Sequence, residues 1–156
     1  MGTWLNSDGL YIKLGTNEAD RTKGGQHRSP AHGGDTVFEF EVLLTDLNTS
    51  TPTIVADNVV LPKNSQIISC EIINEVAATS GGSATLDVGL IRLDRSTEID
   101  YNGIVAAAAL STFNSVGETN SIKFGSTGAG ALMGALSDGT YPGLFVCQAG
   151  TAVFTA

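Results

Sequence analysis

The feature that most restricts the fold is a pair of runs with alternating polarity, residues 65–76 and 84–94, separated by a loop that contains Gly81 and Gly82. Side chains on a strand point alternately to the two faces of a sheet, so a period of two indicates a strand with one buried face. The apolar residues that share a face are Ile68, Cys70, Ile72 and Val76 in the first run and Leu86, Val88 and Leu90 in the second. Because glycine readily adopts positive φ in a connection, we expect the two runs to pair as an antiparallel hairpin.

Alternation with the same period recurs along the chain and predicts an all-β fold. Residues 38–44, 54–61, 122–124 and 143–147 are predicted as further strands, and residues 152–156 are also strand-like. Antiparallel sheets with one buried face pack against each other, so we expect an antiparallel β-sandwich. The predicted core consists of Phe38, Phe40, Val42, Ile68, Ile72, Leu86, Val88, Leu90 and Val146.

One short helix is expected between the strands, over residues 103–110. Asn102 precedes this apolar run and can cap a helix by accepting a hydrogen bond from one of its first backbone amides. The longest apolar run, residues 104–110, is too short to cross a bilayer. We therefore expect no membrane partner.

The first 34 residues are predicted to be an N-terminal arm, with the β-sandwich domain over residues 35–156. A short strand is expected at residues 10–14, and the following residues 16–34 are almost entirely polar. Loops of this length in a compact domain usually bind something or lack regular structure. A frayed terminus would not need a large apolar side chain, so we expect Trp4 and Leu5 to be buried against another surface, such as a partner chain.

Charge also distinguishes the arm from the body. Residues 1–33 hold four basic and three acidic residues, whereas residues 34–156 hold four basic and thirteen acidic ones. An acidic body repels nucleic acid, so no nucleic-acid partner is expected. The basic residues of the arm are expected to meet acidic groups on a partner surface. The alternatives are a solvated loop, or an arm that folds back on its own body or on a sister subunit.

The two cysteines, Cys70 and Cys147, lie in apolar strand-like runs and are predicted to be buried free thiols. A disulfide between them would need a short Cα separation that spacing alone does not establish. Free thiols are typical of a reducing compartment. The start of the chain has no basic region followed by an apolar segment, so synthesis in a cytoplasm is expected.

No group of residues predicts catalysis, and neither a cofactor nor a metal is expected. His27 and His32 are the only histidines, and a closed zinc site needs four well-placed ligands. Asp94, Glu98 and Asp100 lack the spacing of a calcium loop, so a solvated turn is predicted there. A hydrolase would require a cleft with paired carboxylates, and the pattern indicates none.

Several segments together resemble one family of proteins. They are residues 2–15, residues 61–67, and residues 77–90 with their continuation through residues 94–100 and 103–107. These segments resemble small structural proteins of tailed bacteriophages, especially marine phages and cyanophages, that serve as head decoration or capsid cement proteins. The resemblance implies a non-catalytic virion protein with a β-sandwich of jelly-roll type, made in the host cytoplasm. It also implies homotrimers on the capsid exterior, with the phage major capsid protein as partner. Such proteins usually continue with another strand after the position of residues 152–156.

With a capsid as partner, the arm is the predicted binding element. Its apolar anchors and basic contacts would be Trp4, Leu5, Leu10, Tyr11, Lys13, Arg21, Lys23 and Arg28. The glycine-rich segment 125–134 has little charge and suits close approach of chains at a symmetry axis, with Leu132 and Met133 in the oligomer interface. Packing of this segment within its own subunit is the alternative.

A different function compatible with the same fold is a tail-associated or carbohydrate-binding β-sandwich module of a phage. Exposed aromatic residues on one sheet face would favour it. The candidates in the sequence are Tyr101, Tyr141 and Phe113.

Overall fold

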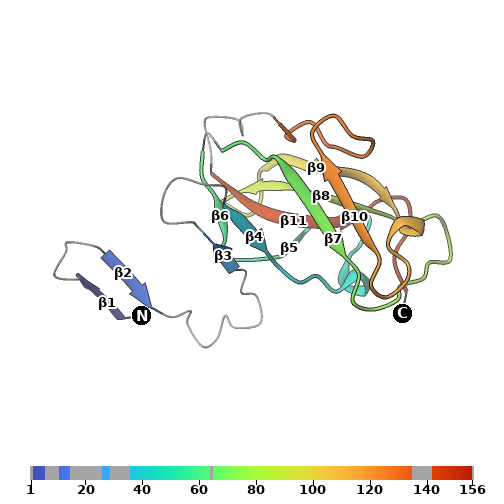
Figure 1. The fold of residues 1–156 in the computed structure, drawn as a ribbon, viewed down its shortest axis with the longest axis horizontal. Helices are drawn as coiled ribbons and strands as arrows, with labels where there is room; N and C mark the ends of the chain where they lie inside the picture. Colours follow the sequence, from blue (N-terminus) through green and yellow to red (C-terminus); the bar gives the residue numbers. More distant parts are fainter. Residues whose placement is uncertain are drawn as a thin grey trace.

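The regular secondary structure of the described residues is antiparallel strands and two short 3-10 turns, without an α-helix (Figure 1). The computed structural model describes the strands at residues 2–5, 11–14 and 26–28, and the chain over residues 36–63, 65–134 and 142–155. The strands are β1 (Gly2–Leu5), β2 (Tyr11–Leu14), β3 (Gln26–Arg28), β4 (Val37–Glu39), β5 (Thr53–Ile54), β6 (Val60–Leu61), β7 (Ser69–Ile73), β8 (Thr85–Arg92), β9 (Glu98–Ala109), β10 (Thr119–Lys123) and β11 (Gly143–Ala149). Two 3-10 turns, η2 (Leu44–Asp46) and η3 (Leu110–Thr112), complete the described elements. The all-β, antiparallel prediction is confirmed.

The larger sheet has five strands, in the order β5-β11-β8-β9 with β6 also paired to β11. The strand β11 is central, because it pairs with β8 along one edge and with β5 and β6 along the other. Both faces of this sheet are buried. On one face Leu90 and Phe145 belong to the main core, and on the other Leu144 and Val146 form a smaller cluster with Ile91.

The second layer is the two-stranded sheet of β7 and β10. These strands lie side by side in front of β8 and β11 in Figure 1. The buried Ile122 and the half-buried Cys70 and Ile72 on its inner face join the main core, which also contains Phe145 and Cys147 of the larger sheet. The two antiparallel sheets therefore share one hydrophobic core.

The predicted hairpin between residues 65–76 and 84–94 is wrong. The strands β7 and β8 form in these runs, but β7 pairs with β10 while β8 lies between β11 and β9. Both edges of β8 are occupied, so no edge is left for β7. The connection between the two strands instead crosses from one sheet to the other. A bridge between Thr79 and Thr155 pins this connection to the C-terminal segment.

The predicted helix over residues 103–110 is also wrong, because these residues are the second half of β9 and the start of η3. Alanine favours helix in isolation, but propensity is a weak prior that tertiary packing overrides. Here the ladder to β8 places Val105 opposite Val88 and Ala108 opposite Leu86, with register shifts along it. The amide of Ala107, which has a φ of 54°, donates to the Asp87 carboxylate at 2.7 Å.

The core prediction is largely confirmed. Four of the predicted residues are buried, namely Leu86, Val88, Leu90 and Val146, and four pack half-buried against the core, namely Phe38, Phe40, Val42 and Ile72. Ile68 is wrong, because its side chain is exposed, and so is that of Val76, which was assigned to the same face. Both residues lie outside the paired segment Ser69–Ile73, where the larger sheet does not cover them.

The chain termini differ from expectation in detail. The strand predicted at residues 10–14 is β2, which pairs with β1, and the expected polar stretch contains β3, which pairs with β4. Residues 152–156 were predicted to be strand-like, yet within the described part they contribute only the bridge at Thr155. The boundary between an arm and a body at residue 35 stays a prediction.

Candidate functional site

The body exposes large apolar side chains around the β7–β10 sheet. The exposed fractions are 57% for Ile68, 61% for Ile73, 71% for Val76, 68% for Val116 and 72% for Phe124. Isolated exposed apolar residues are ordinary on protein surfaces, but groups of them mark contact surfaces. These five residues fall into two groups, one at each end of the β7–β10 ladder.

The first group, here named the Phe124 patch, consists of Ile68 and Phe124. The last pair of the ladder joins Ser69 to Lys123, so Ile68 and Phe124 occupy the next position on each chain. The Phe124 ring lies against Gly134, where even a Cβ atom would overlap it. The side-chain amide of Gln66 donates to the Gly134 carbonyl at 2.7 Å and holds this segment in place. The ring is thus supported from below while its outer surface stays exposed.

The second group, here named the Val76 patch, consists of Ile73, Val76 and Val116. Buried Asn74 organises it, because its amide nitrogen Nδ2 donates to the Ser115 carbonyl at 3.0 Å. The backbone of Asn74 also donates to the carbonyl of residue 118 at 2.9 Å and accepts from the amide of residue 117 at 2.8 Å. These bonds hold Val116 alongside residues 73–76.

Sequence reasoning missed Phe124, Val116 and Ile73 as surface residues. For Ile73 a signal existed, because adjacent residues on a strand face opposite ways and Ile72 already takes the core side. Phe124 was assigned to a strand, although it stands one residue beyond the end of β10. No signal in the sequence identified Val116, whose position depends on the bonds to Asn74.

The residues predicted for an oligomer interface pack within their own subunit. Met133 is only 2% exposed, and Leu132 is half-buried against the core. Leu132 donates from its backbone to the Gly103 carbonyl at 2.7 Å, and its side chain fills the space beside Gly103. The glycine-rich segment thereby covers the free edge of β9, which was the alternative left open by the sequence. An interface role stays a prediction for Leu132, and burial removes Met133 from the accessible surface.

The residues predicted to bind a capsid are only partly within the described residues. The strands β1 and β2 bring Trp4, Leu5, Tyr11 and Lys13 into one antiparallel pair, with Leu5 directly opposite Tyr11. Arg28 ends β3. Leu10, Arg21 and Lys23 lie outside the described residues. The binding role of all eight residues stays a prediction.

The acidic residues considered as cation ligands accept hydrogen bonds from neighbouring residues of their own chain. The Asp94 carboxylate accepts the Thr97 hydroxyl at 2.6 Å and the backbone amides of Ser96 and Thr97 at 2.9 and 2.8 Å. These bonds, led by the one from the Thr97 side chain, hold the pKa of Asp94 well below its usual range. A carboxylate oxygen of Asp100 accepts from the backbone of Asn102 at 3.2 Å. Over the ranges that the structure describes, no three His, Cys, Asp or Glu residues gather as metal ligands.

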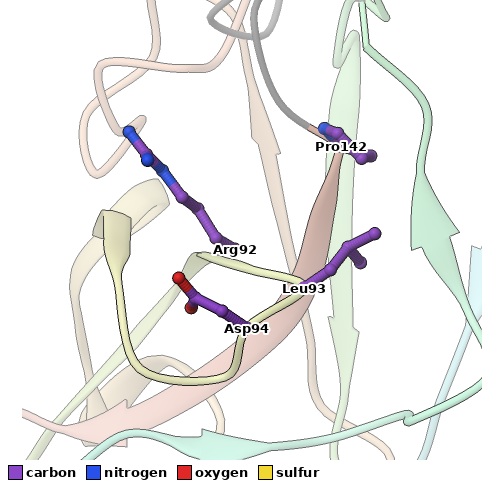
Figure 2. Close-up of a pocket in the computed structure, with 4 residues that line it drawn as sticks. All are labelled: Arg92, Leu93, Asp94 and Pro142. Atoms are coloured by element: carbon purple, nitrogen blue, oxygen red, sulfur yellow. The ribbon is translucent and has the colours of Figure 1, made fainter.

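Two shallow hollows lie on the described surface. One, of about 270 Å³, is lined by Arg92, Leu93, Asp94 and Pro142. Among these four described lining residues, drawn in Figure 2, the one carboxylate is that of Asp94, which the turn already occupies. The other, of about 360 Å³, lies where the 82–85 and 109–114 segments meet, and its described lining contains no carboxylate. The described lining of neither hollow therefore offers the paired carboxylates that a glycoside hydrolase needs.

The aromatic candidates for a sugar-binding face do not gather on the surface. Phe113 is buried and contacts Phe154, with ring centroids 6.1 Å apart, and Tyr101 is half-buried against the smaller cluster. Tyr141 lies outside the described residues. Among side chains whose exposure is described, Phe124 is the only exposed aromatic one.

The two cysteines are free thiols, as predicted. Cys147 is buried in β11, and Cys70 is half-buried in β7. Burial raises the pKa of the Cys147 thiol to about 12. Burial, with a smaller contribution from Glu71, raises the pKa of Cys70 to about 11. Such thiols are protonated and unreactive at neutral pH.

Comparisons with protein-family models, with curated proteins and with solved structures found no match. None of the described helical segments is long and apolar enough to cross a membrane.

Proposed function

We propose that this protein is a structural, non-catalytic virion protein that binds the outside of a phage capsid and stabilises it. In this proposal the body is a β-sandwich of jelly-roll type, assembled as a homotrimer on the capsid exterior, and the major capsid protein is its partner. The sequence resemblance to head decoration proteins of marine phages and cyanophages suggests the class. The surface of the body supports the proposal independently of that resemblance.

One observation carries the proposal: a firmly packed antiparallel body exposes large apolar side chains, five of which fall into two groups at the ends of the β7–β10 ladder. Leaving such side chains exposed has no benefit for folding, and grouped exposed apolar residues are typical of interaction surfaces. A protein that binds to a shell needs a rigid body with several contact surfaces. The two patches on the β7–β10 sheet and the paired strands β1 and β2 supply candidates for those contacts.

The arm is proposed as the capsid-binding element. A two-stranded β-hairpin is only marginally stable by itself in water. Within the described strands, β1 and β2 pair with each other and with no third strand. Packing of the arm's apolar residues, which include Trp4, on a partner would stabilise the arm. The basic residues of the arm would favour an acidic partner surface.

The proposal is tested by quantitative mass spectrometry of purified virions. Hundreds of copies per particle would support decoration of the capsid. A few copies per particle would instead indicate the tail-associated alternative. Absence of the protein from purified virions would contradict both placements.

The arm is tested by deleting residues 1–34 and measuring binding to undecorated capsids. We expect the truncated protein to stay folded, as judged by circular dichroism, and to lose most of its capsid affinity. Truncating a large aromatic residue at the centre of an interface typically costs about 2 kcal/mol or more of binding energy, so Trp4→Ala should weaken binding by more than about tenfold. Saturation of capsids by the truncated protein with unchanged affinity would show that the arm does not bind them.

A further inference from the structure

The two apolar patches carry opposite charge. The segments that form the Phe124 end of the sheet, residues 65–70 and 122–134, contain Lys123 and no acidic residue. The segments that form the Val76 end, residues 72–76 and 114–120, contain Glu75 and Glu118 and no basic residue. Within a body that is acidic overall, the Phe124 end therefore stands out as a local basic site.

The charged side chains lie where a partner could reach them. Lys123 is exposed at the last pair of the ladder, directly before Phe124. Glu75 is exposed directly before Val76. Glu118 is partly committed to its own chain, because its carboxylate accepts the backbone amide of Ser115 at 2.8 Å. Lys123 and Glu75 are therefore the charges best placed for contact with another molecule.

The two ends are complementary in both respects that matter for association. Each presents apolar side chains that would gain by burial, and each places beside them a charge that the other end can neutralise. They cannot meet within one chain, because the paired segment Ser69–Ile73 separates them by roughly 13 Å at about 3.3 Å per residue. They can meet only between two copies.

We propose that the Phe124 patch of one copy binds the Val76 patch of the next, so that the chain associates with itself head to tail. Such a heterologous contact leaves one patch free at each end of a dimer and forms a closed ring when the rotation between copies is suitable. A ring of three copies is the homotrimer of the proposed function, so this inference deepens that part of it. It also assigns the interface to exposed residues, in place of the buried Met133.

The first measurement is the mass of the purified full-length chain by sedimentation velocity over a concentration series. The monomer mass is 16.1 kDa, and we expect species above it that dissociate on dilution. Because exposed charges are screened over about 10 Å at 0.1 M salt, raising the salt concentration should weaken the assembly. A monomer at every concentration would overturn the inference.

A pair of variants distinguishes a head-to-tail contact from a symmetric one. Phe124→Asp disables one patch, and Val76→Asp disables the other. We expect each variant alone to be monomeric and an equimolar mixture to form a one-to-one heterodimer, through the single intact pair of patches. If only one variant loses assembly, or if the mixture stays monomeric, the head-to-tail contact is wrong. Leu43→Asp, at an exposed apolar residue outside both patches, is the matched control and should assemble like the wild type.

Charge reversal gives a second test that keeps both apolar patches intact. Lys123→Glu and Glu75→Lys should each weaken assembly by about tenfold or more, because like charges then face each other across the interface. The double variant restores opposite charges between neighbouring copies and should recover most of the lost affinity. Failure of the double variant to recover would contradict the pairing of these two residues.

The outcomes separate this inference from the proposed function. A chain that saturates capsids but never self-associates would support the proposed capsid binding and contradict the head-to-tail contact. A chain that forms head-to-tail rings but is absent from virions would support the head-to-tail contact and contradict the proposed virion function.

Discussion

β11 in the five-stranded sheet is buried on both faces, whereas β7 in the two-stranded sheet is covered on one face only. Every residue of β11 except Gln148 is buried, but the side chains of β7 alternate between exposed and half-buried. The sequences reflect this difference, since β11 is a continuous apolar run and β7 mixes polar and apolar residues. Periodicity in a sequence thus reports how many faces of a strand are covered. It does not report which strand lies at either edge.

Truncation of Phe145 in β11 should have the largest effect on stability. Its ring contacts those of both Phe38 and Phe40, with centroid distances of 5.3 and 5.0 Å. Phe145→Ala should lower the free energy of unfolding by about 3–5 kcal/mol, measured by chemical denaturation. Phe124→Ala is the matched control at the exposed ring and should change it by less than about 0.5 kcal/mol. Equal effects at the two positions would contradict the contrast between the sheets.

A methyl group at Gly89 in β8 should be the next most damaging change. A Cβ atom there would overlap the backbone of residues 100 and 101, so β8 or β9 would have to shift. Gly89→Ala should lower the free energy of unfolding by about 1–3 kcal/mol, or more if the ladder cannot adjust. Gly81 has no atom near its would-be Cβ, so Gly81→Ala should be neutral or slightly stabilising in the same denaturation assay. A neutral Gly89→Ala would show that β9 does not lie this close.

Each of the two sheets contains one cysteine, and the pKa values of these thiols make the free energy of unfolding depend on pH. Both thiols have ordinary pKa values near 9.0 that burial raises in the folded chain, to about 12 for Cys147 and about 11 for Cys70. The unfolded chain therefore loses these protons first, so the stability they contribute is complete below pH 9 and declines as pH rises from about 9 towards 12. The decline should be shallower in Cys147→Ala than in the wild type. An identical slope in the two proteins would argue against a buried Cys147 thiol.

Replacement of Ile73 on the outer face of β7 should have the smallest effect. Its side chain is largely exposed and lies opposite Thr119 across the ladder. Ile73→Thr keeps the β-branch that strands favour and should change the free energy of unfolding by less than about 0.5 kcal/mol. The measurement should be made on dilute protein, where self-association does not contribute. A loss of more than about 1 kcal/mol in the free energy of unfolding of the monomer would show that Ile73 makes an internal contact.

Much of the fold was predictable from local pattern, because each strand signal depends only on neighbouring residues. The strands at β7, β8 and β11, and most of the core, were located in this way. Pairing was not predictable, since β7 takes its partner from residues 119–123, about fifty positions along the chain. The alanines of β9 favoured a helix locally, and only packing against β8 reverses that preference.

The candidate site was less predictable than the fold. Charge and composition directed attention to the arm, while the exposed patches on the β7–β10 sheet depend on which residues the larger sheet leaves uncovered. Phe124 illustrates this, because its exposure follows from its place one residue past β10 and above Gly134. Only the three-dimensional arrangement also shows that the two patches are separated along one sheet and carry opposite charge.

The central position of β11 has a consequence for biogenesis. The strands β5 and β6 near residue 60 connect to β8 only through β11, whose last residue is Ala149. During translation the larger sheet cannot close until the ribosome has released that strand. Pairings between residues about ninety positions apart, such as Ile54 with Val146, require closure of long loops and slow folding. Until β11 is released, the edge of β8 that pairs with β11 stays unpaired, so chaperone binding during translation would favour the yield of folded protein.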